Sequence, residues 1–117
     1  MTAEKKVYEM IGRAREMNID TLIQLVSESY EIHYQYAKTY GEAAELGVSW
    51  DAEKKLFVVN DLYNEKKYYG DTVHEAYLEC YYTILEEVYF DELKAEREQE
   101  EADYRKNIDI CIARERY

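Results

Sequence analysis

Residues 68–75, Tyr-Tyr-Gly-Asp-Thr-Val-His-Glu, mark the place where the chain changes from strand to helix. The aromatic pair is typical of a strand, and Gly70 permits a turn directly after it. Thr72 and Glu75 have the spacing of a capping box, and Asp71 suits the positive end of a helix dipole. The stretch therefore predicts that a strand ends near residue 69 and that Thr72 caps a long helix.

The residues before this passage allow two interpretations. In the first, short antiparallel strands cover 48–50, 55–60 and 66–69, with a β-hairpin at 55–69, because residues 56–59 are apolar, include β-branched and aromatic side chains, and have turn formers beside them. In the second, Ser49 caps a further helix, and the chain is an all-α bundle. The strand-to-helix passage favours the hairpin. We therefore expect a mainly helical α+β domain with three to four helices.

Apolar residues recur every three to four positions in the first part of the chain, which predicts helices over 4–17 and 21–46. Gly47 follows where a left-handed C-cap would lie. The helix after Thr72 has its expected core face in Val73, Ala76, Tyr77, Cys80, Tyr81, Ile84 and Val88.

Beyond this helix the pattern becomes polar and then apolar again. Residues 94–107 are nearly all polar and predict an exposed, charged helical extension. The apolar residues within 108–112 predict that the chain then docks back onto the rest. We expect residues 1–117 to form a single domain.

The composition excludes several classes of protein. The chain has 117 residues and a net charge of −11. Such acidity argues against a nucleic-acid binder or a protein that binds anionic membranes, because both need surplus Lys and Arg. No apolar run approaches the roughly 20 residues of a membrane span, and no secretory signal is visible. Cys80 and Cys111 suit reduced thiols, so we expect a cytoplasmic protein without membrane contacts.

The sequence contains no catalytic motif, no phosphate-binding loop and no Cys-x-x-Cys pair. Asp71 and His74 resemble half of a carboxylate–histidine metal pair, but helix capping already accounts for Asp71. His33 falls on the core face of its helix, where a buried or half-buried hydrogen-bonding role is expected. We therefore expect no metal, no cofactor and no enzymatic activity.

The acidity is concentrated in one region. Residues 71–92 hold seven acids and no base. On a helical wheel Glu75, Glu79 and Glu86 share a face with Tyr82, and the first two glutamates lie about 6 Å apart along the axis. Two interpretations compete. The carboxylates are either a solvated face that keeps the protein soluble, or a row of charges that docks into a basic cleft.

Tyrosine is the second unusual feature, with 14 residues against two Phe and one Trp. Tyrosine is enriched in protein interfaces because it combines a large apolar ring with a polar tip. On the last long helix a second apolar stripe is formed by Leu78, Tyr82, Leu85 and Tyr89. Such a stripe meets either another element of the fold or another chain. The predicted partner-binding residues are Glu28, Glu31, Tyr36, Glu75, Glu79, Tyr82, Glu86 and Tyr89.

No family motif is present, but in length, acidity and aromatic content the chain is similar to the small acidic proteins with which phages and mobile elements counter host defence. These include DNA mimics of the anti-restriction type and many anti-CRISPR proteins. The likeness implies a non-enzymatic inhibitor that blocks the nucleic-acid cleft of a host nuclease or another basic nucleic-acid-binding protein, without touching nucleic acid itself. The alternative is a structural, assembly or adaptor module, as a homodimer or with one partner chain, that uses the second stripe for helix–helix contacts. A regulatory partner of the antitoxin type is a third option.

Overall fold

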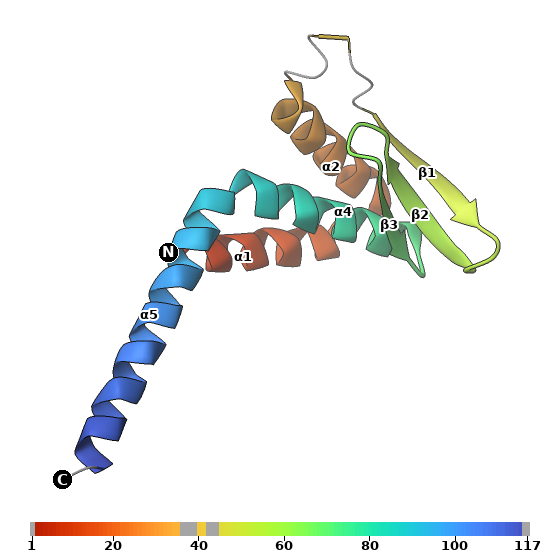
Figure 1. Ribbon diagram of the computed structural model, residues 1–117. Coiled ribbons are helices and arrows are strands. Elements are labelled where there is room, and N and C mark those ends of the chain that lie inside the picture. Colours follow the sequence, from red (N-terminus) through yellow and green to blue (C-terminus); the bar gives the residue numbers. More distant parts are fainter. Residues whose placement is uncertain (1, 36–39, 42–44, 116–117) are drawn as a thin grey trace.

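The strand-to-helix passage organises the fold. The computed structural model describes residues 2–35, 40–41 and 45–115, with side chains described as far as Tyr104. Within these residues four helices accompany a three-stranded antiparallel sheet (Figure 1). The mainly helical α+β expectation is confirmed, and the all-α alternative is wrong. The elements are α1 (Ala3–Glu16), α2 (Ile19–His33), β1 (Leu46–Asp51), β2 (Leu56–Asp61), β3 (Lys66–Gly70), α4 (Val73–Val88) and α5 (Phe90–Glu115).

The sheet has the order β1-β2-β3, so β2 is its central strand. Its two turns are built alike. A carboxylate oxygen of Asp51 accepts the backbone N–H groups two and three residues later, and Asp61 does the same in the second turn. Each turn ends on a residue with φ of 55°, Lys55 or Glu65. An aspartate that satisfies two turn amides is a local signal that stops each strand where it stops.

Gly70 joins the sheet to α4. A Cβ at this position would lie 2.5 Å from the backbone nitrogen of Ala76, so only glycine lets β3 approach the helix this closely. The hydroxyl oxygen of Thr72 then accepts the N–H of Glu75 at 3.1 Å, which caps α4 as expected.

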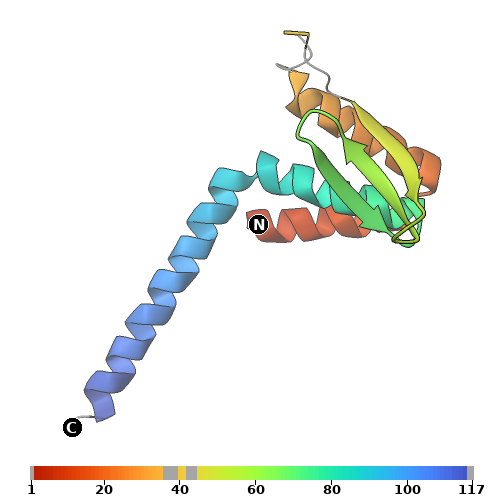
Figure 2. The ribbon, with the colours of Figure 1, turned by 45° about the vertical axis from the view of Figure 1, so that its right-hand side comes forward.

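Helix α4 lies at the centre of the molecule and packs against α1, α2, β2 and β3 (Figures 1 and 2). Six of its seven predicted core residues are buried or half-buried, whereas Val88 is 50% exposed. Leu78 and Leu85 of the second stripe are buried in the same core, which also contains α1. That stripe therefore meets another element of the fold, and its two leucines belong to the core.

The second helix is shorter than predicted. Asn18 caps α2 by accepting the N–H of Thr21 at 2.8 Å, and the helix ends at His33 instead of continuing to residue 46. Leu46 and Gly47, expected as the end of that helix and its cap, begin β1 because they pair with β2. For these two residues, pairing with a neighbouring strand determines the structure, and the helical pattern that precedes them does not.

Helix α5 projects from the domain (Figure 1). Its 26 residues give a length of about 39 Å at the usual rise per residue. The radius of gyration is 19.2 Å, against about 13 Å for a compact chain of this length. The expectation that residues 108–112 dock back is wrong, because the helix runs away from the domain as far as Glu115.

The base of α5 is fixed to α1. The carboxylate of Glu96 accepts the N–H of Ala3 at 2.6 Å and the N–H of Glu4 at 3.3 Å, and Leu93 is buried beside it. A carboxylate at the amino end of a helix satisfies free N–H groups and suits the dipole. No helix in the described part of the chain is both long and apolar enough to cross a membrane.

Candidate protein-binding surface

Three glutamates share one side of α4. We call Glu75, Glu79 and Glu86 the acidic ridge. Glu75 and Glu79 are exposed, whereas Glu86 is half-buried. The rise of a helix places them at intervals of about 6 and 10 Å along the axis. The structure therefore brings together the three carboxylates that the helical wheel assigned to one face.

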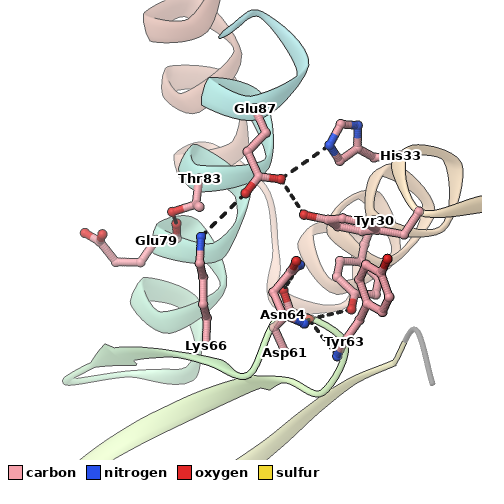
Figure 3. A network of polar contacts seen from close by, with 10 residues as sticks. Tyr30, His33, Asp61, Tyr63, Asn64, Lys66, Glu79, Thr83 and Glu87 are labelled. Carbon is pink, nitrogen blue, oxygen red and sulfur yellow. Dashed lines mark hydrogen bonds and ion pairs between the residues drawn. The ribbon is translucent and has the colours of Figure 1, made fainter. Parts of the chain in front are cut away.

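The carboxylates in the amino-terminal half of the ridge are exposed to solvent. The carboxylate of Glu79 forms no hydrogen bond or ion pair within the described residues, and Figure 3 shows it pointing away from the neighbouring polar network. Glu75 accepts the backbone N–H of Asp71 at 3.1 Å, a contact that leaves its negative charge uncompensated. Arg15 of α1 lines a shallow hollow of about 560 Å³ together with these two glutamates. This base belongs to α1, so a helical wheel of α4 alone could not show it.

The carboxyl-terminal half of the ridge is different. The hydroxyl of Tyr82 donates to Glu86, and this hydrogen bond raises the pKa of the tyrosine, while Arg97 has the opposite effect. Glu86 also lines a hollow of about 240 Å³ with Lys94 and Arg97, where α5 leaves α4. Bases of α5 therefore partly offset this end of the ridge.

The remaining predicted residues do not join the ridge. Glu28 and Glu31 are exposed on α2, which packs against the side of α4 that carries Ile84. At 100° per residue that side lies roughly opposite Glu86. Tyr89 is half-buried against the core, and Tyr36 lies outside the described residues.

A buried polar network, which sequence reasoning did not find, lies between α2, α4 and the β2–β3 turn (Figure 3). Asp61 is 3% exposed and is the one charged residue among the described residues that is fully buried. It accepts the hydroxyl of Tyr30 at 2.5 Å and the side-chain amide of Asn64 at 2.7 Å, besides two backbone N–H groups. Burial, followed by the hydrogen bond to Asp61, raises the pKa of Tyr30 well above its ordinary value.

Glu87 forms the second centre of this network. It accepts the hydroxyl of Tyr34, lies 3.3 Å from Nε2 of His33 and forms an ion pair with Nζ of Lys66 at 3.6 Å. The side chain of His33 is 29% exposed, and its ring lies beside this residue of α4. Burial and the bond to Glu87 raise the pKa of Tyr34. These contacts hold α2, β3 and α4 together. The sequence pattern did not distinguish the carboxylates of this network from those of the ridge.

No catalytic constellation emerges from these groups. Nε2 of His74 lies 3.0 Å from the backbone oxygen of Met17, so its ring joins α4 to α1. Burial raises the pKa of the Cys80 thiol to about 12. Among the described residues no three acidic, histidine or cysteine side chains are grouped to hold a metal ion.

Comparison with known proteins gives no guide to function. No family model, curated protein or solved structure matches the chain.

Proposed function

We propose that the chain is a non-enzymatic acidic binding protein that blocks the nucleic-acid cleft of a basic protein partner, as phage and mobile-element inhibitors of the anti-restriction or anti-CRISPR type do. In this proposal the acidic ridge takes the place of nucleic-acid phosphates. The partner is a host nuclease or another nucleic-acid-binding protein.

One observation supports this proposal most. Glu75 and Glu79 are exposed on the helix that the core surrounds, so the backbone positions that carry them are fixed before any partner binds. Their axial spacing of about 6 Å is comparable with two phosphate steps along one DNA strand, about 7 Å. A rigid row of carboxylates at this spacing suits a cleft lined with Lys and Arg.

The half-buried tyrosine at the ridge supplies the second part of an interface. Tyr82 lies between the core and the surface, and aromatic residues in such places are frequent binding hot spots. The carboxylates would speed association through charge steering, and the ring would slow dissociation. Binding should therefore weaken as the salt concentration rises.

The first experiment immobilises the tagged chain, passes a bacterial lysate over it and elutes with a salt step. A ridge variant, Glu75→Gln with Glu79→Gln and Glu86→Gln, is compared with a control in which Glu9, Glu16 and Glu53 are changed to Gln. Both variants lose three negative charges at residues that are outside the core. A glutamine at 75 can still accept the hydrogen bond from Asp71, so the cap of α4 is kept.

We expect the wild type and the control to retain a nucleic-acid-binding protein that salt releases, and the ridge variant to lose it. The purified partner should then release a labelled oligonucleotide when the wild-type chain is added. Equal binding by the ridge variant at low salt would refute the mimicry mechanism. A salt-resistant partner without a nucleic-acid function would favour the adaptor alternative.

A further inference from the structure

An apolar groove lies where the carboxyl-terminal ends of α2 and α4 meet. Ile32 and Val88 form its rims and are 76% and 50% exposed, and Ile84 and Leu85 line it more deeply. Met10 of α1 contributes a further wall, and the volume is about 370 Å³. Exposed aliphatic side chains on two neighbouring helices, rimmed by polar groups, are typical of a surface that another chain covers.

The same chain carries a segment whose chemistry complements this groove. Residues 105–117 hold four bases and two acids, a net charge of +2, whereas residues 1–104 hold 11 bases and 24 acids, a net charge of −13. The segment also contains three isoleucines, at positions 108, 110 and 112. Near the groove, Glu28 is exposed on α2, one helical turn before Ile32.

The segment cannot reach the groove of its own chain. Residue 108 lies about 27 Å along α5 from Phe90, and α5 leads away from α2 in both views (Figures 1 and 2). The described residues of α5 beyond Leu93 are exposed, apart from Glu96, which caps α1. A helix that is polar on all sides serves as a bridge through solvent, here between the domain and an apolar, basic end.

We propose that two copies of this chain associate by exchange, with residues 105–117 of each copy docked in the apolar groove of the other. The arrangement is isologous, so a single pair closes without forming a fibre. It covers the exposed rims of the groove and places a positive segment against a negative domain. This inference goes beyond the proposed function and does not depend on the acidic ridge.

The oligomeric state tests the exchange. Sedimentation velocity and light scattering are measured at protein concentrations of about 1 to 100 µM, where small interfaces dissociate. We expect the full chain to reach twice its mass of 14.1 kDa at the upper end. Ile32→Glu and Ile112→Glu should each keep it at the single mass. The matched control is Leu62→Glu, because Leu62 is 55% exposed but lies outside the groove; this variant should still dimerise.

Each other outcome overturns the proposal. A wild-type chain that stays monomeric at about 100 µM would mean that a different partner binds the groove. Dimers of either isoleucine variant would mean that the chains meet elsewhere. Circular dichroism spectra of all variants show whether a loss of mass reflects lost association or lost folding.

Cross-linking identifies the contact directly. Ser29 lines the groove, and the sequence places a cysteine at 111 in the docking segment. With oxidised glutathione as the oxidant, Ser29→Cys should give a disulfide-linked dimer on a non-reducing gel. The dimer should disappear when Cys111→Ser is added, and the wild-type chain should not match its yield. A dimeric Ser29→Cys chain that does not cross-link through residue 111 would refute docking in the groove.

Discussion

Replacement of Asp61 by Asn is the sharpest test of the polar network. The carboxylate accepts four hydrogen bonds while 3% exposed, and one of them comes from the side-chain amide of Asn64 at 2.7 Å. An asparagine that keeps the first oxygen in place would turn its own NH₂ group toward the amide NH₂ of Asn64. Hydrogen bonds to a charged group contribute about 1.5–3 kcal/mol, and a buried donor without a partner costs about 1–3 kcal/mol. We expect Asp61→Asn to lower the free energy of unfolding by about 3 kcal/mol.

Asp51→Asn is the matched control, because Asp51 accepts two backbone N–H groups in the same kind of turn but lies nearer the surface. Asparagine can keep both bonds, so we expect a loss of about 0.5 kcal/mol or less, as for most surface changes. Urea unfolding followed by circular dichroism measures both values. With a slope of about 1.5 kcal/mol per M, 3 kcal/mol moves the midpoint by about 2 M.

A double-mutant cycle with Tyr30→Phe completes the test. The single change removes a hydroxyl that donates to Asp61 at 2.5 Å, yet leaves the carboxylate with three other donors, so we expect a loss of about 1.5 kcal/mol. The two changes should be non-additive by about 1 kcal/mol, since the residues share a contact. The reasoning fails if Asp61→Asn costs no more than Asp51→Asn, or if Tyr30 and Asp61 prove additive.

Three further predictions concern single contacts. Glu96→Ala should destabilise the chain by about 1 kcal/mol in urea unfolding because the N–H groups at the start of α1 lose their acceptor, whereas Glu98→Ala, exposed on the same helix, should change little. Gly70→Ala should lower the free energy of unfolding by about 1–3 kcal/mol, because the added Cβ would lie 2.5 Å from a backbone nitrogen of α4. Gly12→Ala, inside α1 with nothing within 4 Å, should raise it by up to about 1 kcal/mol. An equal effect at both sites would contradict this account. Burial raises the pKa of Cys80 from 9.0 to about 12, so the stability contributed by the protonated thiol is complete below pH 9 and is lost as the pH rises toward 12. Iodoacetamide at pH 8, followed by mass spectrometry of the peptides, should label Cys80 only after urea unfolding.

The sequence predicted the strand-to-helix passage because its signals are local. Gly70 permits the close approach of β3, and Thr72 caps α4 with its own side chain, so neither depends on distant residues. The strands were predicted from their residue types and neighbouring turn formers, which are also local signals, although β1 begins two residues earlier than the expected 48–50. The glutamates of the ridge were also grouped correctly, because helical periodicity alone decides which of them share a face.

Long-range contacts explain what the sequence could not give. The apolar spacing predicted a helix as far as residue 46, but Leu46 and Gly47 pair with β2 and begin β1. Val88 fits the core stripe of α4, yet it is 50% exposed among the described residues. The tyrosine partners of Asp61 and Glu87 are 31 and 53 residues away in the sequence, so no local pattern could show that these two carboxylates accept hydrogen bonds from α2 and its cap.

The tyrosines and the acidity of the chain have one common explanation. Three carboxylates, Asp61, Glu86 and Glu87, each accept a tyrosine hydroxyl, and only Glu87 has an ion pair as well within the described part of the chain. A hydroxyl satisfies a half-buried carboxylate as a hydrogen-bond donor but adds no positive charge. A chain that used Lys or Arg for this purpose would gain the same bonds and lose its negative field. The use of tyrosine therefore adds no positive charge where α4 packs against its neighbours, and the exposed amino-terminal half of the ridge remains acidic, as an acidic binding surface requires.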